Sequence, residues 1–537
     1  MASFSFANLK PSARVFLADA AWVIVATALL LTPAALWGRP FVFGDTIYYW
    51  GWGGNILDAL AHPWPHAGQP WVHGRTLQGW GFATHDATLA DLRFNLTWLT
   101  ARSAFYAVPF RLLFDVGGIW LIAVIQALAC AMLLKIAVQA VAPRASWLAT
   151  IVVVAALAAL TSLGFEAGYM MPDVFGGLAI AAAAILVIFP ERLGRAAKAF
   201  LLALIVYAVV AHAENSLNMA VAAALAVLLN SSQGWRAAFA RAAPVALALV
   251  AGLAVAAAGS GVLSYAFGRP LHMPPFAESR LLADGAAQTY LRQSCASGRL
   301  AACDLADKPP APIEHYLWIY PLESPVTGAG KAAVQRVLAQ DERLMHRHVT
   351  DAEASQRERF VAEQPRLVLG AIEHGAGQEA REAMASAFVA VTNFGVKADF
   401  DSATFYALGG PAILHRQLDA LLGGGAEQGR YPLDPASLVQ RLAVMMALLV
   451  LGVKALRKDA SADPDLSRFV VLVLVMVIVN AVLCGVISGP YARYQARVVW
   501  LIPFLALATA VRSYAPAPAL IAKRQAALAI GLRKMPH

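Results

Sequence analysis

The sequence predicts an all-α protein that crosses a membrane many times, and three observations carry this prediction. Hydrophobic residues make up 59% of the 537 residues, whereas charged residues make up only 14%. Soluble domains carry about 25% charged residues. The apolar residues gather in runs close to the roughly 20 residues that a helix needs to span a bilayer. Lysines and arginines stand between these runs and not in one aromatic-rich patch, which argues against a nucleic-acid-binding protein.

The apolar runs predict about ten membrane spans. The first run is expected to remain as a span, because no clear small-residue cleavage site follows it. The two runs in the middle of the chain that begin at 197 and 216 are the shortest. The expected spans cover 16–37, 117–140, 146–164, 173–189, 197–212, 216–230, 243–265, 439–456, 468–487 and 495–512.

Basic residues predict the orientation of these spans, because loops rich in Lys and Arg remain in the cytoplasm. They occupy every second loop and both ends of the chain, so both termini and the loop 454–468 are expected to be cytoplasmic. The residues are Lys10, Arg14, Arg144, Arg192, Arg195, Lys198, Arg236, Arg241, Lys454, Arg457, Lys458, Lys523, Arg524, Arg533 and Lys534.

A long polar insert divides the spans into two groups. Residues 1–265 hold seven expected spans and a long outer loop at 38–116, residues 266–438 form the insert, and residues 439–537 hold three spans and a cytoplasmic tail. The insert carries 16 Lys and Arg against 20 Asp and Glu, a net charge of −4, whereas the whole chain is +9. This difference in sign favours an extracytoplasmic insert.

Four cysteines fall into two kinds of surroundings. Cys130 and Cys484 lie within apolar runs and are expected to be small core residues. Cys295 and Cys303 lie together in the insert, where an oxidising compartment would favour a disulfide between them.

Short helices are expected on the outer side. In the outer loop, 47–61 and 86–100 show helical patterning and are expected to lie flat on the membrane. The insert begins with a proline-rich stretch at 269–276. Its helical patterning falls at 331–350, 353–372 and 377–392, before the breaker Gly423-Gly424-Gly425, so it is predicted to be a mostly helical domain.

The stretch from Phe43 to Gly54 organises the rest of the sequence. It directly follows the first span and reads Phe-Gly-Asp-Thr-Ile-Tyr-Tyr-Trp-Gly-Trp-Gly-Gly. Asp45 therefore falls at the lipid–water boundary, where Gly44 allows a bend and the aromatic residues suit the interface. A solvated interfacial aspartate is the plain alternative. If the apolar surround dominates, we expect it to raise the pKa of Asp45.

Other ionisable residues are expected at the same outer boundary, where such groups usually face a cavity or a partner. Arg493 and Arg497 stand four positions apart and so share one helix face. The full set is Glu166, Asp173, His212, Glu214, Tyr491, Arg493, Tyr494 and Arg497.

Each of these residues also has a purely structural alternative. Asp173 follows Pro172 and suits a helix N-terminus, where the dipole favours an acid. His212 and Glu214 can pair with each other, and the arginines can extend to the interface as anchors. The histidines of the outer loop match no compact zinc pattern and are expected to be solvated. They are His62, His66, His73 and His85. The sequon Asn95-Leu96-Thr97 is a frequent chance match.

Taken together, these features resemble the GT-C class of integral-membrane glycosyltransferases, which use polyprenyl-phosphate-linked sugars. The resemblance lies in Gly44-Asp45-Thr46 with Tyr48 after the first span, in the long outer loop, and in Pro172-Asp173 at the fourth span. It covers about residues 1–265. The insert departs from those members whose soluble domain is terminal, which leaves the acceptor and the subfamily open.

The resemblance implies a sugar transfer on the outer face of a bacterial-type cytoplasmic membrane, from a polyprenyl-phosphate donor to a glycan or lipid-linked acceptor. Asp45 would be the general base. Arg493, Arg497 and Tyr494 would bind the donor phosphate, because guanidinium groups match phosphate oxygens. Some relatives use a divalent cation, for which Mg²⁺ or Mn²⁺ would suit oxygen ligands. The candidate ligands, for metal or acceptor, are Glu166, Asp173, His212 and Glu214.

Other functions remain open at the level of sequence. A transporter or flippase would place charges near the bilayer midplane and show a repeat, and neither is visible. A ligase or acyltransferase of lipid-linked cell-envelope glycans would use a similar outer-face site. A scaffold protein would use the insert to bind a partner.

Overall fold

The computed structural model is built from α-helices, as the sequence predicts. It describes residues 11–63, 88–296, 300–322, 333, 336, 347–396, 433–457 and 463–514. Within these ranges the β structure is limited to one isolated bridge between Phe41 and Tyr169. In the described part of the chain, six helical segments are long and apolar enough to cross a membrane: Ala104–Val141, Glu214–Gln233, Trp235–Phe267, Leu433–Leu456, Pro464–Ile487 and Ala492–Ser513. The length and composition of these helices therefore support the prediction of a multi-pass membrane protein.

The first part of the chain forms a helical body. Three further apolar segments in the described chain are shorter, namely Leu17–Leu30, Trp147–Leu160 and Val174–Ile188. The helices of this part are α1 (Pro11–Leu30), α2 (Thr32–Trp37), α5 (Ala104–Val141), α6 (Trp147–Leu160), α7 (Leu163–Ala167), α8 (Val174–Ile188), α9 (Arg195–Ala211), α10 (Glu214–Asn230) and α11 (Trp235–Phe267).

Helix α8 is the centre of this body, since every residue from Val174 to Ile188 is buried. Small residues on α8 let neighbouring helices approach closely, as is common in membrane bundles. Gly177 shows the closest approach, because a Cβ built there would lie 2.4 Å from the carbonyl oxygen of Arg497. The glycine therefore allows the helix that carries Arg497 to pack directly on α8.

Several expected spans differ from the structure at their ends. Helix α5 begins at Ala104, ahead of the expected start at 117, and it kinks at Gly117 and Gly118, where Gly118 has φ +65°. The first expected span divides into α1 and α2 ahead of Pro33, since a proline suits the first turn of a new helix. The third ends at Leu160, because Thr161 is extended.

The outer loop holds helices α3 (Gly44–Ala61) and α4 (Leu89–Leu99), close to the predicted stretches 47–61 and 86–100. The insert holds α12 (Phe276–Ala283), α13 (Ala286–Cys295), the π-turn η6 (His315–Ile319), α15 (Asp351–Ala362) and α16 (Gln364–Thr392). The predicted helix at 331–350 and the glycine breaker at 423–425 lie almost entirely outside the described residues.

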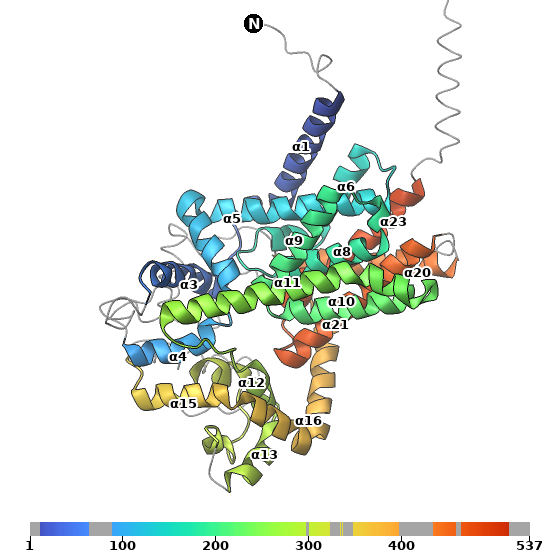
Figure 1. The fold of residues 1–537 in the computed structure, drawn as a ribbon. Coiled ribbons are helices and arrows are strands. Elements are labelled where there is room, and N and C mark those ends of the chain that lie inside the picture. The colour runs from blue at the N-terminus through green and yellow to red at the C-terminus, as the bar shows by residue number, and fades with distance from the viewer. Residues whose placement is uncertain are drawn as a thin grey trace, which may run out of the picture.

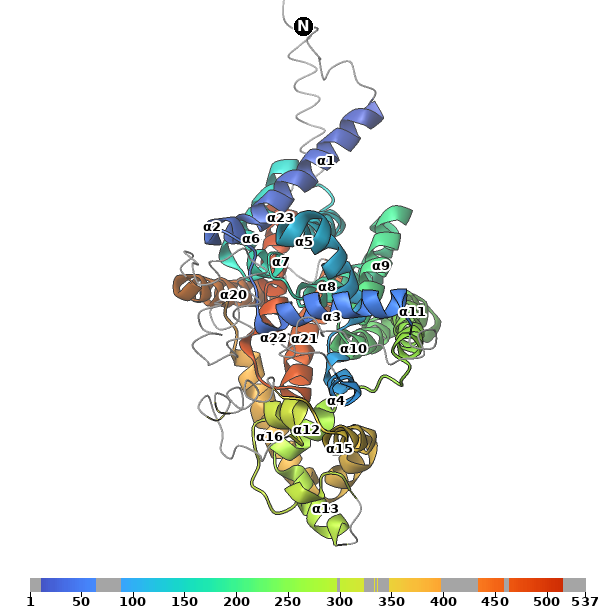
Figure 2. The same cartoon turned by 90° about the vertical axis from the view of Figure 1, so that its left-hand side faces the viewer.

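The insert has its own core and also docks on α4. Its apolar centre includes Leu282, Leu291 and Phe360, and the predicted disulfide between Cys295 and Cys303 is present. On α4, the carboxylate of Asp91 accepts hydrogen bonds from the backbone of Val349 at 2.7 Å. Arg93 pairs with Glu358 at 2.7 Å. In both views of the fold, α4 lies against α15 (Figures 1 and 2).

The last part of the chain forms α20 (Leu433–Leu456), α21 (Pro464–Ile487), α22 (Ala492–Val499) and α23 (Leu501–Tyr514). The last predicted span is thus two helices that meet at Trp500. The start of α1 and the end of α23 both lie on the side of the molecule opposite α12, α13 and α15 (Figures 1 and 2). The first and last described helices therefore end on one side of the molecule, away from these helices of the insert.

Candidate functional site

Asp45 lies in the first turn of α3, where the helix dipole favours a negative charge. The preceding Phe43 is extended, and its backbone N–H donates to the Thr46 hydroxyl oxygen at 2.9 Å. The Thr46 hydroxyl donates to the carbonyl of Met170 at 3.3 Å. The bridge between Phe41 and Tyr169 holds the same two segments together. The turn after the first span is therefore fixed against the turn before α8.

Arg102 is the direct partner of Asp45, and the two side chains form an ion pair. The Arg102 guanidinium lies between two aromatic rings, 4.7 Å from the centroid of Tyr48 and 4.6 Å from that of Trp318. The indole N–H of Trp52 donates to the Arg102 carbonyl at 3.1 Å. The Arg102 side chain is 6% exposed, whereas that of Asp45 is 24% exposed. The carboxylate thus stays accessible while its partner is enclosed.

Nearby charges outweigh the apolar surround in setting the pKa of the Asp45 carboxyl. Burial by itself would raise the pKa of Asp45, but the guanidinium groups of Arg102 and Arg493 outweigh it. The pKa of this carboxyl therefore lies below its ordinary value, and the expectation of a raised pKa is wrong. The reason is that the opposite charges come from distant parts of the chain. Asp45 is consequently ionised at neutral pH.

Arg493 approaches the same site from α22. Its guanidinium lies 4.4 Å from the ring centroid of Phe43 and 4.9 Å from that of Tyr494. One of its nitrogens donates to the Tyr494 hydroxyl at 3.2 Å. Its Nη1 is buried and makes no hydrogen bond to the part of the chain that the structure describes. Arg493 also interacts electrostatically with Asp45 and Asp173. It therefore brings to the site a positive charge and a donor that has no acceptor among the described residues.

Arg497 shares the Tyr494 ring with Arg493, as the four-residue spacing predicts, but it is held differently. Its side chain is 1% exposed and pairs with Glu214. It also lies 3.7 Å from a carboxylate oxygen of Asp173 and donates to Asn480 at 3.1 Å. Arg497 is thus engaged with internal partners. The geometry favours Arg493 over Arg497 as the group that meets a ligand.

The predicted metal or acceptor ligands are only partly brought together. Asp173 and Glu214 lie on either side of Arg497, and His212 interacts with the same charges. Glu166 is fully buried and lies near Cys130 of α5, so we leave it outside the site. Within the described residues, no group of three or more His, Cys, Asp or Glu side chains could hold a metal ion. The guanidinium of Arg497 stands where a cation shared by Asp173 and Glu214 would sit.

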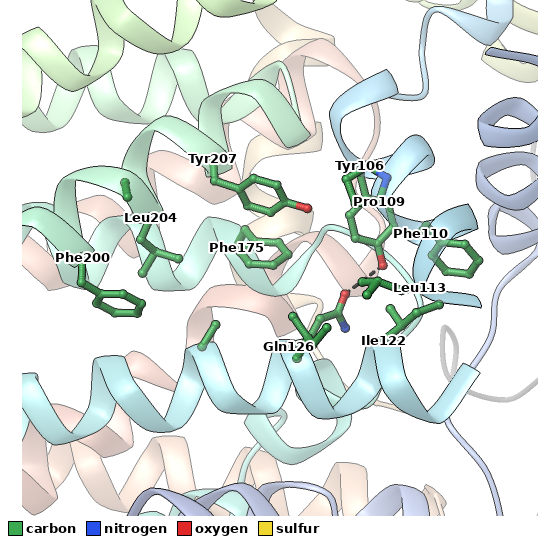
Figure 3. A pocket seen from close by; sticks show the side chains of 13 residues that line it. Tyr106, Pro109, Phe110, Leu113, Ile122, Gln126, Phe175, Phe200, Leu204 and Tyr207 are labelled. Carbon is green, nitrogen blue, oxygen red and sulfur yellow. Dashed lines mark hydrogen bonds between the residues drawn. The ribbon is translucent and has the colours of Figure 1, made fainter. Parts of the chain in front are cut away.

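An apolar pocket of about 260 Å³ opens between α5, α8 and α9. Tyr106, Gln126 and Tyr207 supply its polar atoms, and the Tyr106 hydroxyl points to Gln126 at 2.8 Å (Figure 3). The remaining lining is apolar, with Phe175 close to Tyr207 in the same view. The ring of Tyr106 packs edge-on against Tyr49 at 4.9 Å. Since Tyr49 is one turn after Asp45, this aromatic pair separates the pocket from the charged site.

Sequence reasoning missed two residues of the site. Arg102 and Trp318 were not singled out, because an arginine and a tryptophan in polar segments carry no local signal of their own. The sequon is not an accessible acceptor, because Asn95 and Thr97 are each 2% exposed. Of the loop histidines, His62 bonds to Asp58 in an exposed position, and the other three lie outside the described residues.

Comparisons with protein-family models, curated proteins and solved structures find no match to this chain. The function must therefore be argued from the site itself.

Proposed function

We propose that this chain is a membrane glycosyltransferase of the GT-C type. It moves a sugar from a polyprenyl-phosphate donor to a hydroxyl of a glycan or lipid-linked acceptor, on the outer face of a bacterial-type cytoplasmic membrane. The observation that carries the proposal is the ion pair of Asp45 with Arg102, with the Arg493 guanidinium near enough to lower the pKa of Asp45 and an apolar pocket behind Tyr49 and Tyr106. A carboxylate, a phosphate-matching cation and an apolar pocket for a lipid tail are the groups that such a transfer needs.

Asp45 serves as the base in this proposal. The acceptor hydroxyl donates its hydrogen bond to the Asp45 carboxylate, and its oxygen forms a new bond to the anomeric carbon of the sugar. The bond between that carbon and the phosphate oxygen breaks, its electron pair stays on the polyprenyl phosphate, and the hydroxyl proton passes to Asp45. The lowered pKa keeps the carboxylate ionised for this task, and Arg102 holds it in one orientation.

Arg493 serves as the donor-phosphate ligand. Charge-assisted hydrogen bonds from a guanidinium to phosphate are stronger than neutral ones, and they strengthen further as charge develops on the leaving oxygen. The buried Nη1 supplies such a donor, and the Tyr494 hydroxyl lies beside it. Among the described residues, the carboxylates around Arg497 form no three-ligand set, and the charge of the leaving group would therefore be stabilised by arginine.

The apolar pocket suits part of an isoprenoid chain. Its volume of about 260 Å³ lies below the range of a drug-sized site, which fits one segment of a long chain rather than a whole ligand. Its lining comes from three apolar helices, so an isoprenoid tail would meet apolar side chains there. The donor would thus place its tail between α5, α8 and α9 and its phosphate near Arg493.

The topology is part of the proposal. We propose that about ten apolar segments cross the membrane, the shorter helices included, with the seven-span portion 1–265 ahead of the insert. The insert 266–438 lies outside, and the C-terminal portion 439–537 adds the remaining spans. The site residues then lie at the outer boundary, where a lipid-linked donor and an extracytoplasmic acceptor can meet.

Ligand binding tests this function directly. We would measure the affinity of the full chain in nanodiscs for farnesyl phosphate and for farnesol, which share a tail and differ in the phosphate. We expect farnesyl phosphate to bind at least about tenfold more tightly, because a hydrogen bond to a charged group contributes about 1.5–3 kcal/mol. Equal affinity for the two would overturn the proposed donor class. Transfer is then assayed with farnesyl-phosphate-linked hexoses and octyl β-glucoside as acceptor.

A further inference from the structure

We infer that residues 314–320 of the insert, here called the insert arm, form the acceptor-side wall of the site, and that Trp318 is a positioning residue for Arg102 and Asp45. This inference rests on the proposed function for its kinetic consequence. Its structural part is that the insert holds the ion pair of Asp45 and Arg102 in place, and this part rests only on observed contacts. The arm is far from Asp45 in sequence, and nothing in the family resemblance includes it.

Arg357 of α15 fixes the insert arm. Its side chain is completely buried, and its guanidinium donates to the carbonyls of Tyr316 at 2.8 Å, Leu317 at 2.5 Å and Tyr320 at 3.0 Å. The same guanidinium donates to the Thr97 hydroxyl of α4 at 2.9 Å. One side chain therefore satisfies the carbonyls of the π-turn and ties it to the outer loop.

Trp318 links the insert arm to the ion pair of Asp45 and Arg102. Its ring lies 4.6 Å from the Arg102 guanidinium, on which Tyr48 also packs. Arg102 in turn pairs with Asp45. Phe276 meets the Trp318 ring edge-on at 6.4 Å, so the indole itself has a packed neighbour in the insert. The orientation of the Asp45 carboxylate thus depends on an aromatic ring supplied by the insert.

The arm also reaches the other half of the site. Glu314 accepts a hydrogen bond from the Tyr491 hydroxyl, and the Tyr491 ring packs edge-on against Tyr494 at 5.6 Å. Tyr494 is the residue on which Arg493 and Arg497 lie. One short segment therefore contacts both the base side and the phosphate side of the site, from the direction of the insert.

This placement gives the two substrates different directions of approach to Asp45. The apolar pocket approaches Asp45 through Tyr49 and Tyr106, from the helical body. The insert arm approaches Asp45 through Trp318 and Arg102, from the insert. If the lipid-linked donor enters from the first side, as proposed, the acceptor hydroxyl enters beside the arm. Disturbing Trp318 should consequently alter acceptor use and leave donor binding unchanged.

Hydrogen exchange of the full chain in nanodiscs tests the physical coupling without any substrate. We expect Trp318→Ala to increase deuterium uptake severalfold in the segment 100–104, since Arg102 loses one of its two rings. Trp318→Phe keeps a ring over the guanidinium and should restore protection. Trp235→Ala is the matched control, because Trp235 is 61% exposed on α11. Unchanged uptake in Trp318→Ala would overturn the inference.

Steady-state transfer from a farnesyl-phosphate-linked hexose to octyl β-glucoside supplies the kinetic test. Trp318→Ala should raise the acceptor KM by on the order of tenfold, the size of a desolvated cation–π contact. The affinity for farnesyl phosphate should stay within about twofold of wild type. The acidic limb of the pH–rate profile should move to higher pH, because a looser Arg102 lowers the pKa of Asp45 less.

The outcomes distinguish this inference from the proposed function. If wild-type protein neither binds farnesyl phosphate preferentially nor transfers sugar, the proposed function fails, and the exchange experiment still decides whether the arm holds Arg102. If transfer occurs but Trp318→Ala weakens donor binding with an unchanged acceptor KM, the proposed function stands and the acceptor-side assignment is wrong.

Discussion

Asp45 illustrates how a carboxylate can be held ready without a raised pKa. Its negative charge meets Arg102 from the end of the outer loop and Arg493 from near the end of the chain. Opposite charges at short range stabilise the ionised form more than burial disfavours it. The carboxylate is therefore fixed in orientation and ionised, as the proposed base needs to be.

We predict that Asp45→Asn strongly slows transfer and leaves folding intact. The amide has nearly the same shape, yet it cannot accept a proton, so transfer should fall by a factor on the order of 10²–10⁴. Binding of farnesyl phosphate should persist. Asp58→Asn is the matched control on the same helix, because Asp58 lies at an exposed position beside His62. Transfer at the wild-type rate in Asp45→Asn would move the base assignment to Asp173 or Glu214.

The two arginines of α22 should give different phenotypes. Sequence alone treats Arg493 and Arg497 alike, as ligands of the phosphate. Arg493→Ala should weaken farnesyl phosphate binding by about 1.5–3 kcal/mol, the size of a hydrogen bond to a charged group, with thermal stability retained. Arg111→Ala removes an outer-face arginine that pairs within its own helix and serves as the control. Unchanged affinity in Arg493→Ala would make this residue an interfacial anchor.

Arg497→Ala should instead destabilise the protein. The substitution strands the buried carboxylates of Asp173 and Glu214, and removing one partner of a buried ion pair costs about 3–5 kcal/mol. A lowered thermal midpoint in detergent, or loss of folded protein on expression, is the expected result. A stable Arg497→Ala protein that no longer binds farnesyl phosphate would show that Arg497, too, contacts the donor.

At the scale of elements, the packing of α12 against the π-turn η6 gives the insert a dependence on pH. His315 in η6 is completely buried, and neither ring nitrogen makes a hydrogen bond to the described residues. Burial, with Lys308 and Arg357 nearby, lowers the pKa of His315 from 6.5 to about 4. Because the folded pKa lies below the unfolded one, the neutral ring stabilises the fold above pH 6.5.

We therefore predict that the insert loses stability as the pH falls from about 6.5 towards about 4, by on the order of 3 kcal/mol in total. Thermal unfolding of the full chain, followed across this range, measures the effect. His315→Gln cannot take up the proton and should flatten the curve in this window. An equally steep loss in His315→Gln would assign the pH dependence to other groups.

Glu278 of α12 should change the stability of the insert with pH in the opposite direction to His315. It is completely buried, its carboxylate oxygens make no hydrogen bond to the described residues, and burial holds the pKa of Glu278 well above 4.5. A raised carboxyl pKa contributes stability that is present below the unfolded pKa and is lost as pH rises. Glu278→Gln should thus unfold at a higher temperature than wild type at pH 7.5 and match it below pH 4.5. A lower midpoint at pH 7.5 would show that Arg357 needs the carboxylate.

At the scale of the whole molecule, the fold places the insert opposite the start of α1 and the end of α23 (Figures 1 and 2). The disulfide between Cys295 and Cys303 adds an independent argument for an outside insert, since such bonds persist in oxidising compartments. The charge pattern, the arrangement of the helices and the disulfide all favour the same orientation.

Thiol labelling in intact cells tests this orientation. We predict that Ala376→Cys in α16 reacts with a membrane-impermeant maleimide from outside, whereas Gly194→Cys between α8 and α9 reacts only after permeabilisation. A side chain fits at Gly194, where an added Cβ meets no atom within 4 Å. The native Cys130 and Cys484 are buried, so they should not react with the maleimide. Labelling of Gly194→Cys from outside would reverse the orientation and remove the basis of the proposed function.

Much of this architecture was predictable from local patterns. Long apolar runs specify membrane helices because a lipid-exposed backbone must satisfy its own hydrogen bonds. The short helices α3 and α4 and the Cys295–Cys303 pair were also visible as local features. Asp45 and Arg493 stood out because an ionisable group next to a long apolar run is costly and rare.

The pairing of these groups was decided by the tertiary structure. Arginines are ordinary in polar segments, so Arg102 and Arg357 carry no local signal that distinguishes them from solvated neighbours. Their roles arise from contacts with Asp45, Trp318 and the carbonyls of the insert arm, which lie far apart in the chain. The pKa of Asp45 was likewise decided by contacts between distant parts of the chain. An apolar surround can be read from adjacent residues, whereas the two guanidinium groups that reverse its effect reach the carboxylate only after the chain has folded.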